Sequence, residues 1–337
     1  MPITIHQNYA LTHQNTLGLP SVARYYTEVS SVAELQEVLG FAKEKTLAII
    51  PLGGGSNVVF GDCINDLVIH IALMGREVVD RNGDRITVTA GAGENWHEFV
   101  LWSIEQNAFG FENLSLIPGT VGAAPIQNIG AYGVEIKDHF VALEALNIVT
   151  GQLEQFDVDD CQFGYRDSVF KGRLRDQYII TSVTFALDAV LSAKLGYGQL
   201  SEKVGSKGSD AQKISQAVCE IRQQKLPDPK VIGNVGSFFK NPEVDHKTME
   251  RLKKEYPDIV AYPVDGKWKL AAGWLIDRAG LRGVKQGHVG TYEKQALVLV
   301  NHGEATGAEV IAFSELVLET VKSRNGLVFK KLWCLSI

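Results

Sequence analysis

Hydrophobic residues recur every three or four positions in several stretches of the chain, which is the spacing of one buried face on a helix. In residues 31–45 the stripe is formed by Val32, Leu35, Leu39 and Ala42. A serine or threonine followed three positions later by glutamate or glutamine precedes three of these stretches and is typical of a capping box. The pattern therefore predicts helices over residues 31–45, 95–106, 209–224 and 306–323, capped at Ser31, Ser209 and Thr306.

Short apolar runs and alternating segments predict strands between these helices. They lie at residues 46–52, 58–60, 67–71, 85–90, 142–149, 153–158, 178–187, 297–300 and 327–332. The first part of the chain is richer in predicted strands, and the later part mixes helices with strands. Between them, residues 189–209 are rich in Gly, Ser and Lys, so we expect a domain boundary there.

Length and charge exclude several classes of protein. The chain has 337 residues, 45% of them hydrophobic, with a formal net charge of -6. The length suggests two domains or one large one. General nucleic-acid binding needs clustered Lys and Arg, which this acidic chain lacks. A secretory signal and a membrane-spanning run are also missing from the sequence. No coiled-coil pattern occurs, so we expect a monomer.

The four cysteines are widely spaced and form no CxxC motif. They are Cys63, Cys161, Cys219 and Cys334. In a long chain without a signal this pattern is typical of free thiols in a reducing compartment. The eight histidines show no HxH or HExxH spacing, so no zinc site is expected. We therefore predict a cytoplasmic, metal-free protein.

A glycine cluster follows the predicted strand at 46–52. Its members are Gly53, Gly54 and Gly55, followed by Ser56 and Asn57. Glycines let backbone amides converge on an anion because no Cβ stands in the way. A dinucleotide fingerprint needs a third spaced glycine and a following helix, and a P-loop needs Gly-Lys-Ser/Thr. Neither is present, so an anion-binding loop and a flexible turn both remain open.

Residues 117–133 form a second unusual segment, made of small and neutral polar residues. Long uncharged loops inside a compact domain are uncommon unless they are functional. This one suits the close approach of a large, flat, phosphorylated ligand. The alternative is a buried, tightly turned connection.

Three further segments carry polar or aromatic candidates. Arg166 either pairs with Asp167 at the surface or binds a carboxylate through its planar fork. Ser237 lies among glycines without a GxSxG elbow, so it is either a loop hydrogen-bonder or an oriented proton donor. Tyr197 and Tyr262 are loop aromatics that either cover a ligand or anchor packing.

Seven motifs together resemble the UDP-N-acetylenolpyruvoylglucosamine reductases. They occur in the order of that family between residues 53 and 301, and the match as a whole runs from about residue 15 to about residue 325. In sequence they are GGGSNVVF, IPGTVGAAPIQNIGAYG, FGYRDSVFK, KLPDPK, GSFFKNP, KLAAGWLID and ALVLVN. The loop around Tyr262 is similar to the subtype that folds a tyrosine over its substrate. Each motif is modest alone, and their collinearity makes the resemblance specific.

The resemblance implies an α+β fold with three parts. Residues 1–190 would form a two-part FAD-binding domain of the vanillyl-alcohol-oxidase type. Residues 191–322 would form a smaller α+β substrate-binding domain, and residues 323–337 a strand that returns to the active site. FAD would be the bound cofactor and NADPH the co-substrate. The implied activity is reduction of UDP-N-acetylglucosamine enolpyruvate to UDP-N-acetylmuramate for peptidoglycan synthesis.

The resemblance also assigns roles to individual residues. Ser237 would protonate the substrate carbon next to the one that receives hydride, and Arg166 would stabilise the enolate on the substrate carboxylate. The substrate-binding residues would be Tyr132, Tyr197, Lys225, Asn241, Tyr262 and Gln295. The FAD-binding residues would be Gly53, Gly54, Gly55, Ser56, Asn57, Pro118, Gly119, Thr120, Gly122, Ala123, Ile126, Asn128 and Gly130.

The C-terminal segment departs from the family. The family carries a pattern close to Leu-x-Pro-Glu-Val-Arg, whose glutamate assists proton transfer, whereas residues 327–337 contain no acid. An ungapped comparison puts Leu332 at the glutamate and Cys334 at the arginine, and a short deletion would put a lysine there. One alternative is therefore a protein that binds FAD and the UDP-sugar but turns over poorly. A flavin oxidase of the same superfamily is another, although residues 53–57 lack the histidine to which many of those attach FAD.

Overall fold

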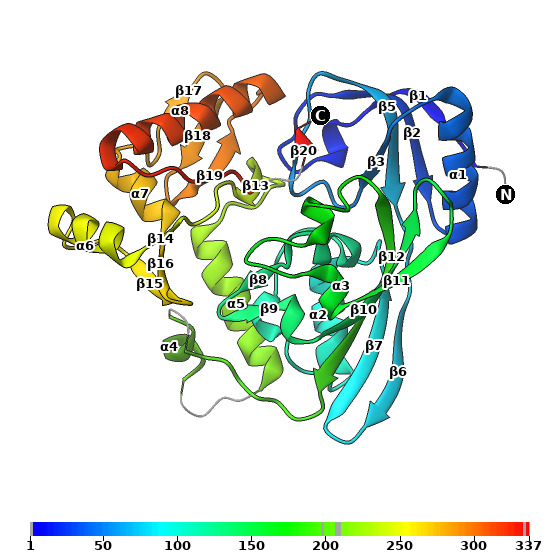
Figure 1. The fold of residues 1–337 in the computed structure, drawn as a ribbon, viewed down its shortest axis with the longest axis horizontal. Coiled ribbons are helices and arrows are strands. Elements are labelled where there is room, and N and C mark those ends of the chain that lie inside the picture. Colours follow the sequence, from blue (N-terminus) through cyan, green and yellow to red (C-terminus); the bar gives the residue numbers. More distant parts are fainter. Residues whose placement is uncertain (1–2, 197–198, 206–209, 333–334, 337) are drawn as a thin grey trace. The chain divides into compact units, whose positions relative to one another are not determined.

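The computed structural model describes residues 3–196, 199–205, 210–332 and 335–336. The chain divides into two compact units, each assembled from several stretches of sequence (Figure 1). The first unit comprises Met1–Tyr9, Ala23–Gly55 and Ile64–Gln224, and the second comprises Ala10–Val22, Ser56–Cys63 and Lys225–Ile337. The break after residue 224 lies downstream of the expected boundary near residue 190, and the three-part division stays a prediction.

A four-stranded sheet opens the first unit, in the order β1-β2-β5-β3. Its strands are β1 (His6–Ala10), β2 (Val22–Val29), β3 (Ile49–Leu52) and β5 (Cys63–Ile71). Helix α1 (Val32–Lys45) joins β2, which was not predicted, to β3; the helix itself was predicted, and the Ser31 side chain accepts from the Glu34 amide. In a capping box the Glu34 carboxylate would accept from the Ser31 amide. Here it accepts from the Ser30 amide at 2.7 Å, one residue earlier in the chain.

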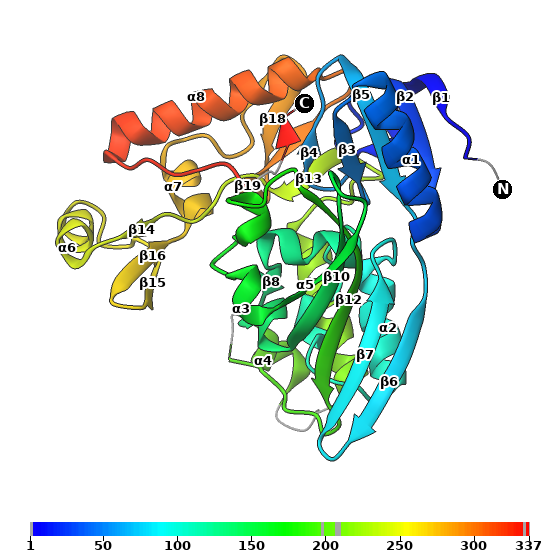
Figure 2. The ribbon, with the colours of Figure 1, turned by 45° about the vertical axis from the view of Figure 1, so that its right-hand side comes forward.

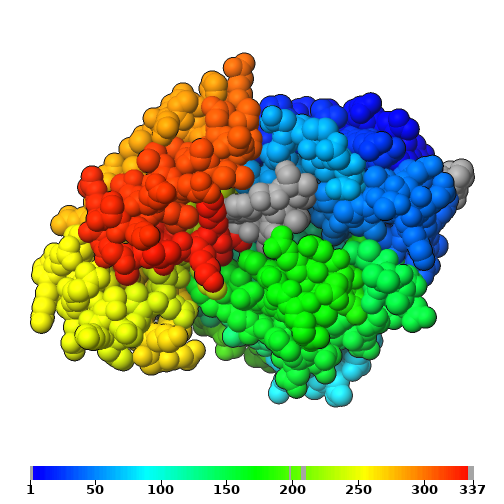
Figure 3. Space-filling view, turned by 45° about the horizontal axis from the view of Figure 1, so that its top comes forward, coloured from blue at the N-terminus to red at the C-terminus, as the bar shows by residue number. Residues whose placement is uncertain are grey.

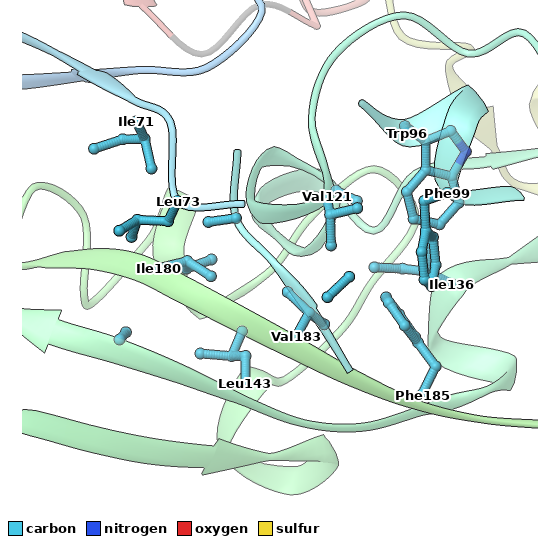
Figure 4. Close-up of a cluster of buried hydrophobic side chains, with 14 of the residues drawn as sticks. Ile71, Leu73, Trp96, Phe99, Val121, Ile136, Leu143, Ile180, Val183 and Phe185 are labelled. Carbon is cyan, nitrogen blue, oxygen red and sulfur yellow. The ribbon is translucent and has the colours of Figure 1, made fainter. Parts of the chain in front are cut away.

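A five-stranded antiparallel sheet in the order β11-β10-β12-β7-β6 follows (Figure 2). The strands are β6 (Arg76–Asn82), β7 (Arg85–Gly91), β10 (Phe140–Asn147), β11 (Leu153–Asp157) and β12 (Tyr178–Asp188). Strand β6 was not predicted, because most of its side chains are exposed and carry no apolar alternation. Helix α2 (Trp96–Glu105) packs Trp96 and Phe99 against Phe185 of β12 (Figure 4).

Short turns fill the segment between α2 and β10, where a long uncharged loop was predicted. They are η2 (Glu112–Leu114), η3 (Val121–Ala123), η4 (Pro125–Gln127), β8 (Gly130–Ala131), β9 (Val134–Glu135) and η5 (Ile136–Asp138). After this segment come α3 (Val158–Cys161), η6 (Val169–Lys171) and α4 (Leu200–Val204). The first unit ends in α5 (Ala211–Lys225). The predicted cap Ser209 lies outside the described residues, and Asp210 accepts from the Gln212 amide at 2.9 Å.

The second unit is built around the sheet β13-β19-β18-β17. Its strands are β13 (Gly233–Ser237), β17 (Lys285–Gln286), β18 (Val289–Tyr292) and β19 (Gln295–Asn301). A three-stranded sheet in the order β14-β16-β15 is formed by β14 (Glu243–Val244), β15 (Ala261–Val264) and β16 (Lys267–Leu270). Its helical elements are η1 (Thr12–Gln14), α6 (His246–Glu255), α7 (Ala272–Arg278) and α8 (Gly307–Asn325). Helix α8 has the predicted Thr306–Glu309 capping box, ends at Gly326, and lies on the surface of the unit (Figure 3).

The strand predicted at residues 327–332 is wrong. Leu327 and Phe329 are buried in the core of the second unit, while Val328 is exposed. The alternation of apolar residues in the sequence therefore reflects which side chains are buried, and not the hydrogen-bond pairing of a strand. The segment makes one isolated antiparallel bridge, between Lys331 and Phe239. A two-residue strand, β20 (Leu335–Ser336), lies beyond it and pairs in parallel with β4 (Val58–Val59).

Among the helices formed by the described residues, none is long and apolar enough to cross a membrane. Within the same residues, no three acidic, cysteine or histidine side chains are grouped so as to hold a metal ion. Cys63, Cys161 and Cys219 are free thiols, and Cys334 lies outside the described part of the chain.

Candidate functional site

The two glycine-rich segments of the first unit touch each other. Gly53 and Gly54 begin the turn after β3, and both lie against residues 119–120. A Cβ at Gly53 would lie 2.6 Å from Thr120 Oγ1, and one at Gly54 would lie 3.1 Å from the Gly119 Cα. Gly55 has a φ of +60°, which favours glycine. The two segments can therefore approach this closely only because side chains are missing.

The 119–122 segment is held in place by the residues that lead into α2. The Trp96 amide donates to the Gly119 carbonyl at 3.1 Å, and the Gly122 amide donates to the Ala92 carbonyl at 3.0 Å. A Cβ at Gly122 would lie 2.4 Å from the Ala92 Cβ. Tight packing and backbone hydrogen bonds thus fix the loop before any ligand binds.

Between these segments and β12 lies a recess with an apolar, largely uncharged lining, which we call the cofactor recess. Its predicted members are Gly53, Thr120, Gly122, Ala123 and Ile126. Sequence reasoning missed its other members, Pro51, Ile71, Ala92, Tyr178, Ile179 and Ile180. These residues come from apolar strands and the turns beside them. Nothing local to each strand indicates that β3, β5 and β12 converge.

The lining of the cofactor recess fits FAD, the cofactor that the resemblance implies. Small and aliphatic side chains suit a flat ring system, and the glycine segments leave room for a close backbone approach. Pro118 and Gly119 lead into this wall. Ser56 and Asn57 are assigned to the second unit, and the lining residues of the recess do not include them.

Arg166 lies close to the end of the second glycine-rich segment. Its guanidinium donates to the carbonyl of Asn128 at 3.2 Å and also to the carbonyl of Gly130. The Asp167 carboxylate accepts from the Ser168 amide. Arg166 is partly buried and has a φ of +53°, an uncommon conformation for a residue with a side chain. The backbone turn therefore directs Arg166 toward this loop.

Asn128 is fully buried and bonded on both sides of its amide. Its Nδ2 donates to the Glu135 carboxylate and to the Gly164 carbonyl, and its Oδ1 accepts from the Lys137 amide. Its backbone has a φ of +43°. These bonds give Asn128 a structural part in shaping the loop.

Tyr132 is the substrate-binding candidate of the first unit. The Asn113 side chain donates to its carbonyl at 2.8 Å, and its ring packs against the α5 cluster. Burial lowers the pKa of Arg222, Tyr132 acts against this shift, and the positive charge of Arg166 adds to it. Arg222, a residue that sequence reasoning missed, thus lies near both candidates. Tyr197 lies outside the described residues.

In the second unit, Ser237 ends β13 with an exposed side chain. It pairs with Val298 of β19. Gly236, just before it, has a φ of +66°, and its amide donates to Asn234 Oδ1 at 2.9 Å. The bend at Gly236 places the serine hydroxyl at the surface of this unit.

Asn241 and Gln295 meet at the first turn of α7. Asn241 Oδ1 accepts from the Ala272 amide at 2.9 Å, and Gln295 Oε1 lies 2.6 Å from where a Cβ on Gly273 would stand. Tyr262 lies on the β15–β16 hairpin and is 43% exposed. Lys225, at the end of α5, is exposed and begins the second unit.

The C-terminal segment runs beside Ser237. The Leu332 amide donates to the Phe238 carbonyl at 2.9 Å, and the Lys240 amide donates to the Lys330 carbonyl at 2.7 Å. Leu332 is buried, and the Lys331 ammonium pairs with Glu315 at 3.2 Å. A residue at position 332 is therefore held against the residue that follows Ser237.

Comparison with known proteins gives matches over nearly the whole chain. Residues 23–157 match the FAD binding domain model, and residues 227–331 match the C-terminal domain of UDP-N-acetylenolpyruvoylglucosamine reductase. The UDP-N-acetylenolpyruvoylglucosamine reductase of Pseudomonas putida is 46% identical over 331 residues, or 97% of each chain. That of Bdellovibrio bacteriovorus is 47% identical over 325 residues, or 96% of this chain and 97% of the relative.

The crystal structure of the same enzyme from Thermus caldophilus shares the fold, with a TM-score of 0.68 at 21% identity over 100% of this chain and 99% of that one. Fold and recess define an FAD-binding oxidoreductase of α+β class with a separate C-terminal part, as predicted. The chain belongs to the UDP-N-acetylenolpyruvoylglucosamine reductase family.

Substitution of Gly53 by alanine is expected to weaken FAD binding about tenfold or more. The new Cβ would lie 2.6 Å from Thr120 Oγ1, so the wall of the cofactor recess must shift. Titration of the flavin-free protein with FAD, followed by flavin fluorescence, measures the change.

The matched control is Gly40→Ala, on the exposed side of α1, where a Cβ meets nothing within 4 Å. It should keep FAD affinity and raise the free energy of unfolding by about 0.5–1 kcal/mol. Equal FAD affinity in the two variants would contradict the part assigned to Gly53.

Proposed function

We propose that the chain reduces UDP-N-acetylglucosamine enolpyruvate to UDP-N-acetylmuramate with NADPH, in the formation of peptidoglycan precursors. The observation that carries this proposal is the contact of two glycine segments beside an apolar recess, in a chain of this family. FAD, when bound, would supply the redox chemistry of passing a hydride from NADPH to the enolpyruvyl double bond. The chain has to bind it, position the substrate and deliver a proton.

Arg166 is proposed to stabilise negative charge on the substrate carboxylate. A planar guanidinium matches a carboxylate, and a cation held before the reaction begins lowers the barrier most where charge develops. The contacts of Arg166 with the carbonyls of Asn128 and Gly130 support this part, because they fix its orientation.

Ser237 is proposed as the proton donor. Its hydroxyl is exposed at the end of β13, and the bend at Gly236 orients it. Proton transfer by an oriented side chain requires reach and alignment, and the exposed position leaves room for a substrate.

The remaining candidates are proposed to bind the UDP-sugar. Asn241 and Gln295 support this part because they converge on one turn, and Tyr262 because its ring is exposed on a hairpin. Tyr132, Tyr197 and Lys225 are assigned by the family pattern alone. A cytoplasmic monomer remains our proposal, as does the tyrosine-loop subtype.

Absorbance of the purified protein and its NADPH oxidation test this function directly. We expect a bound flavin spectrum and NADPH oxidation that depends on UDP-N-acetylglucosamine enolpyruvate. The protein without substrate is the control for oxidation by oxygen. Absence of both flavin and turnover would contradict the proposal.

A second candidate is a protein that binds FAD and the UDP-sugar with impaired catalysis. The observation in its favour is the buried aliphatic side chain of Leu332, whose amide is bonded to the residue after Ser237. Bound FAD and UDP-sugar with negligible NADPH oxidation would identify it.

A further inference from the structure

Side chains from two helices tie down the three residues before the 117–122 segment. From α2, Trp96 Nε1 donates to the Leu114 carbonyl at 3.0 Å, and His97 Nδ1 accepts from the Leu116 amide at 3.1 Å. From α5, Ser215 bonds the Ser115 hydroxyl at 2.7 Å, and Arg222 Nε donates to the Leu116 carbonyl at 3.3 Å. Both backbone polar groups of Leu116 are thus bonded to side chains.

Leu116 is the strained point of this arrangement. Its φ is +59°, a conformation that costs a residue with a side chain about 1–2 kcal/mol. Only Ile117 and Pro118 separate it from Gly119, which touches the other glycine segment at Gly54. Strain of this kind persists only where the surroundings hold it, so loss of a bond at Leu116 would let the segment that enters the cofactor recess relax.

The hydrogen bond from the Leu116 amide to His97 Nδ1 can form only when the imidazole is neutral. Its Nδ1 accepts a hydrogen bond, so the proton of the neutral ring is on Nε2, which faces Cys219 Sγ at 3.9 Å. A protonated imidazole carries hydrogen on both nitrogens and has no acceptor left. Its Nδ1–H would then face the Leu116 N–H, two donors in one small space.

We propose that His97 is a positioning residue for the cofactor, which holds Leu116 and the 117–122 segment while its ring is neutral and releases them when it is protonated. This inference rests on the proposed part of that segment in FAD binding. It predicts that the protein loses FAD as the medium becomes acidic.

The charged neighbours set the pH range of this release. Burial lowers the pKa of His97 below its ordinary value of 6.5, Arg222 lowers it further, and Glu98 opposes both. The pKa of the Cys219 thiol is raised by burial, so this neighbour stays neutral in acid. Because the bound form needs neutral His97, FAD affinity is complete above the pKa of His97 and falls as the pH drops through it, below 6.5.

The test measures the dissociation constant of FAD by flavin fluorescence between about pH 5 and about pH 8 in three variants. His97→Asn keeps an oxygen acceptor near the place of Nδ1 and cannot be protonated. His97→Leu has no acceptor at any pH. His288→Asn, in the second unit beside Glu309, controls for removal of a histidine elsewhere.

We expect the dissociation constant of the natural protein and of His288→Asn to rise about tenfold or more in acid, the scale of a lost buried hydrogen bond. His97→Asn should show a flat profile, and His97→Leu should bind weakly throughout. Superimposable profiles for the natural protein and His97→Asn would overturn the inference, even if His97→Leu failed to fold. A natural protein that binds no FAD at neutral pH would instead overturn the proposed function, and with it this inference.

Discussion

Leu332→Glu is expected to raise kcat at least about tenfold, because it places a carboxyl group beside the proposed proton donor. The Leu332 amide is bonded to the Phe238 carbonyl, so the backbone at this position is fixed next to Ser237. Leu332 is only 9% exposed, and burial at such a place raises the pKa of a glutamate and keeps it protonated. A positioned acid typically contributes about 10²–10⁴-fold to a rate.

Two variants separate an acid from a mere polar side chain. Leu332→Gln has the same size as the glutamate and cannot supply a proton, so its kcat should stay at the level of the natural protein. Lys331→Glu tests the neighbouring position, which bridges to Phe239. Steady-state oxidation of NADPH with saturating substrate measures all three. Equal rates in Leu332→Glu and Leu332→Gln would mean that the natural protein needs no acid at position 332.

Ser237→Ala is expected to lower kcat by about 10²–10⁴-fold with a small change in KM. The proposed part of the serine is proton donation in the transition state, and the loss of an interaction made only there lowers kcat. FAD retention should be unchanged, because the cofactor recess is formed by residues of the first unit. Stopped-flow measurement of flavin absorbance separates reduction by NADPH from reoxidation by the substrate.

Only reoxidation by the substrate should slow in Ser237→Ala. Ser201→Ala, at an exposed position of α4, is the matched control and should leave both steps unchanged. If Ser237→Ala keeps its reoxidation rate, another group donates the proton. If its reduction by NADPH slows as well, the serine has a part in positioning that the proposal does not include.

Local signals predicted the four helices with the clearest caps or periodicity, α1, α2, α5 and α8, and missed α3, α4, α6 and α7. Helices α1 and α8 begin at their capping residues Ser31 and Thr306, because a cap is an interaction between residues three positions apart. Strands β7 and β12 were predicted because apolar residues alternate or follow one another in their sequences. Strand β6 was not predicted because most of its side chains are exposed. It is a strand because its backbone pairs with β7.

The C-terminal segment shows how a local pattern misleads. The alternation of residues 327–332 is real, since Leu327 and Phe329 are buried and Val328 is exposed. A strand also needs a neighbouring edge with which its backbone can form a ladder, and the pairing of this segment is a single isolated bridge between Lys331 and Phe239 among the described residues. Alternation therefore predicted which side chains are buried and could not predict pairing.

The sequence by itself determined the family, the use of FAD and the two glycine segments, because motifs in a fixed order are a property of the chain alone. Only the tertiary structure decided that Gly53 lies against Thr120, and that Leu116 is tied to His97 and Arg222. These contacts join residues far apart in sequence. They depend on how helices and sheets pack, since burial and hydrogen bonding are satisfied by whichever groups the fold brings within reach.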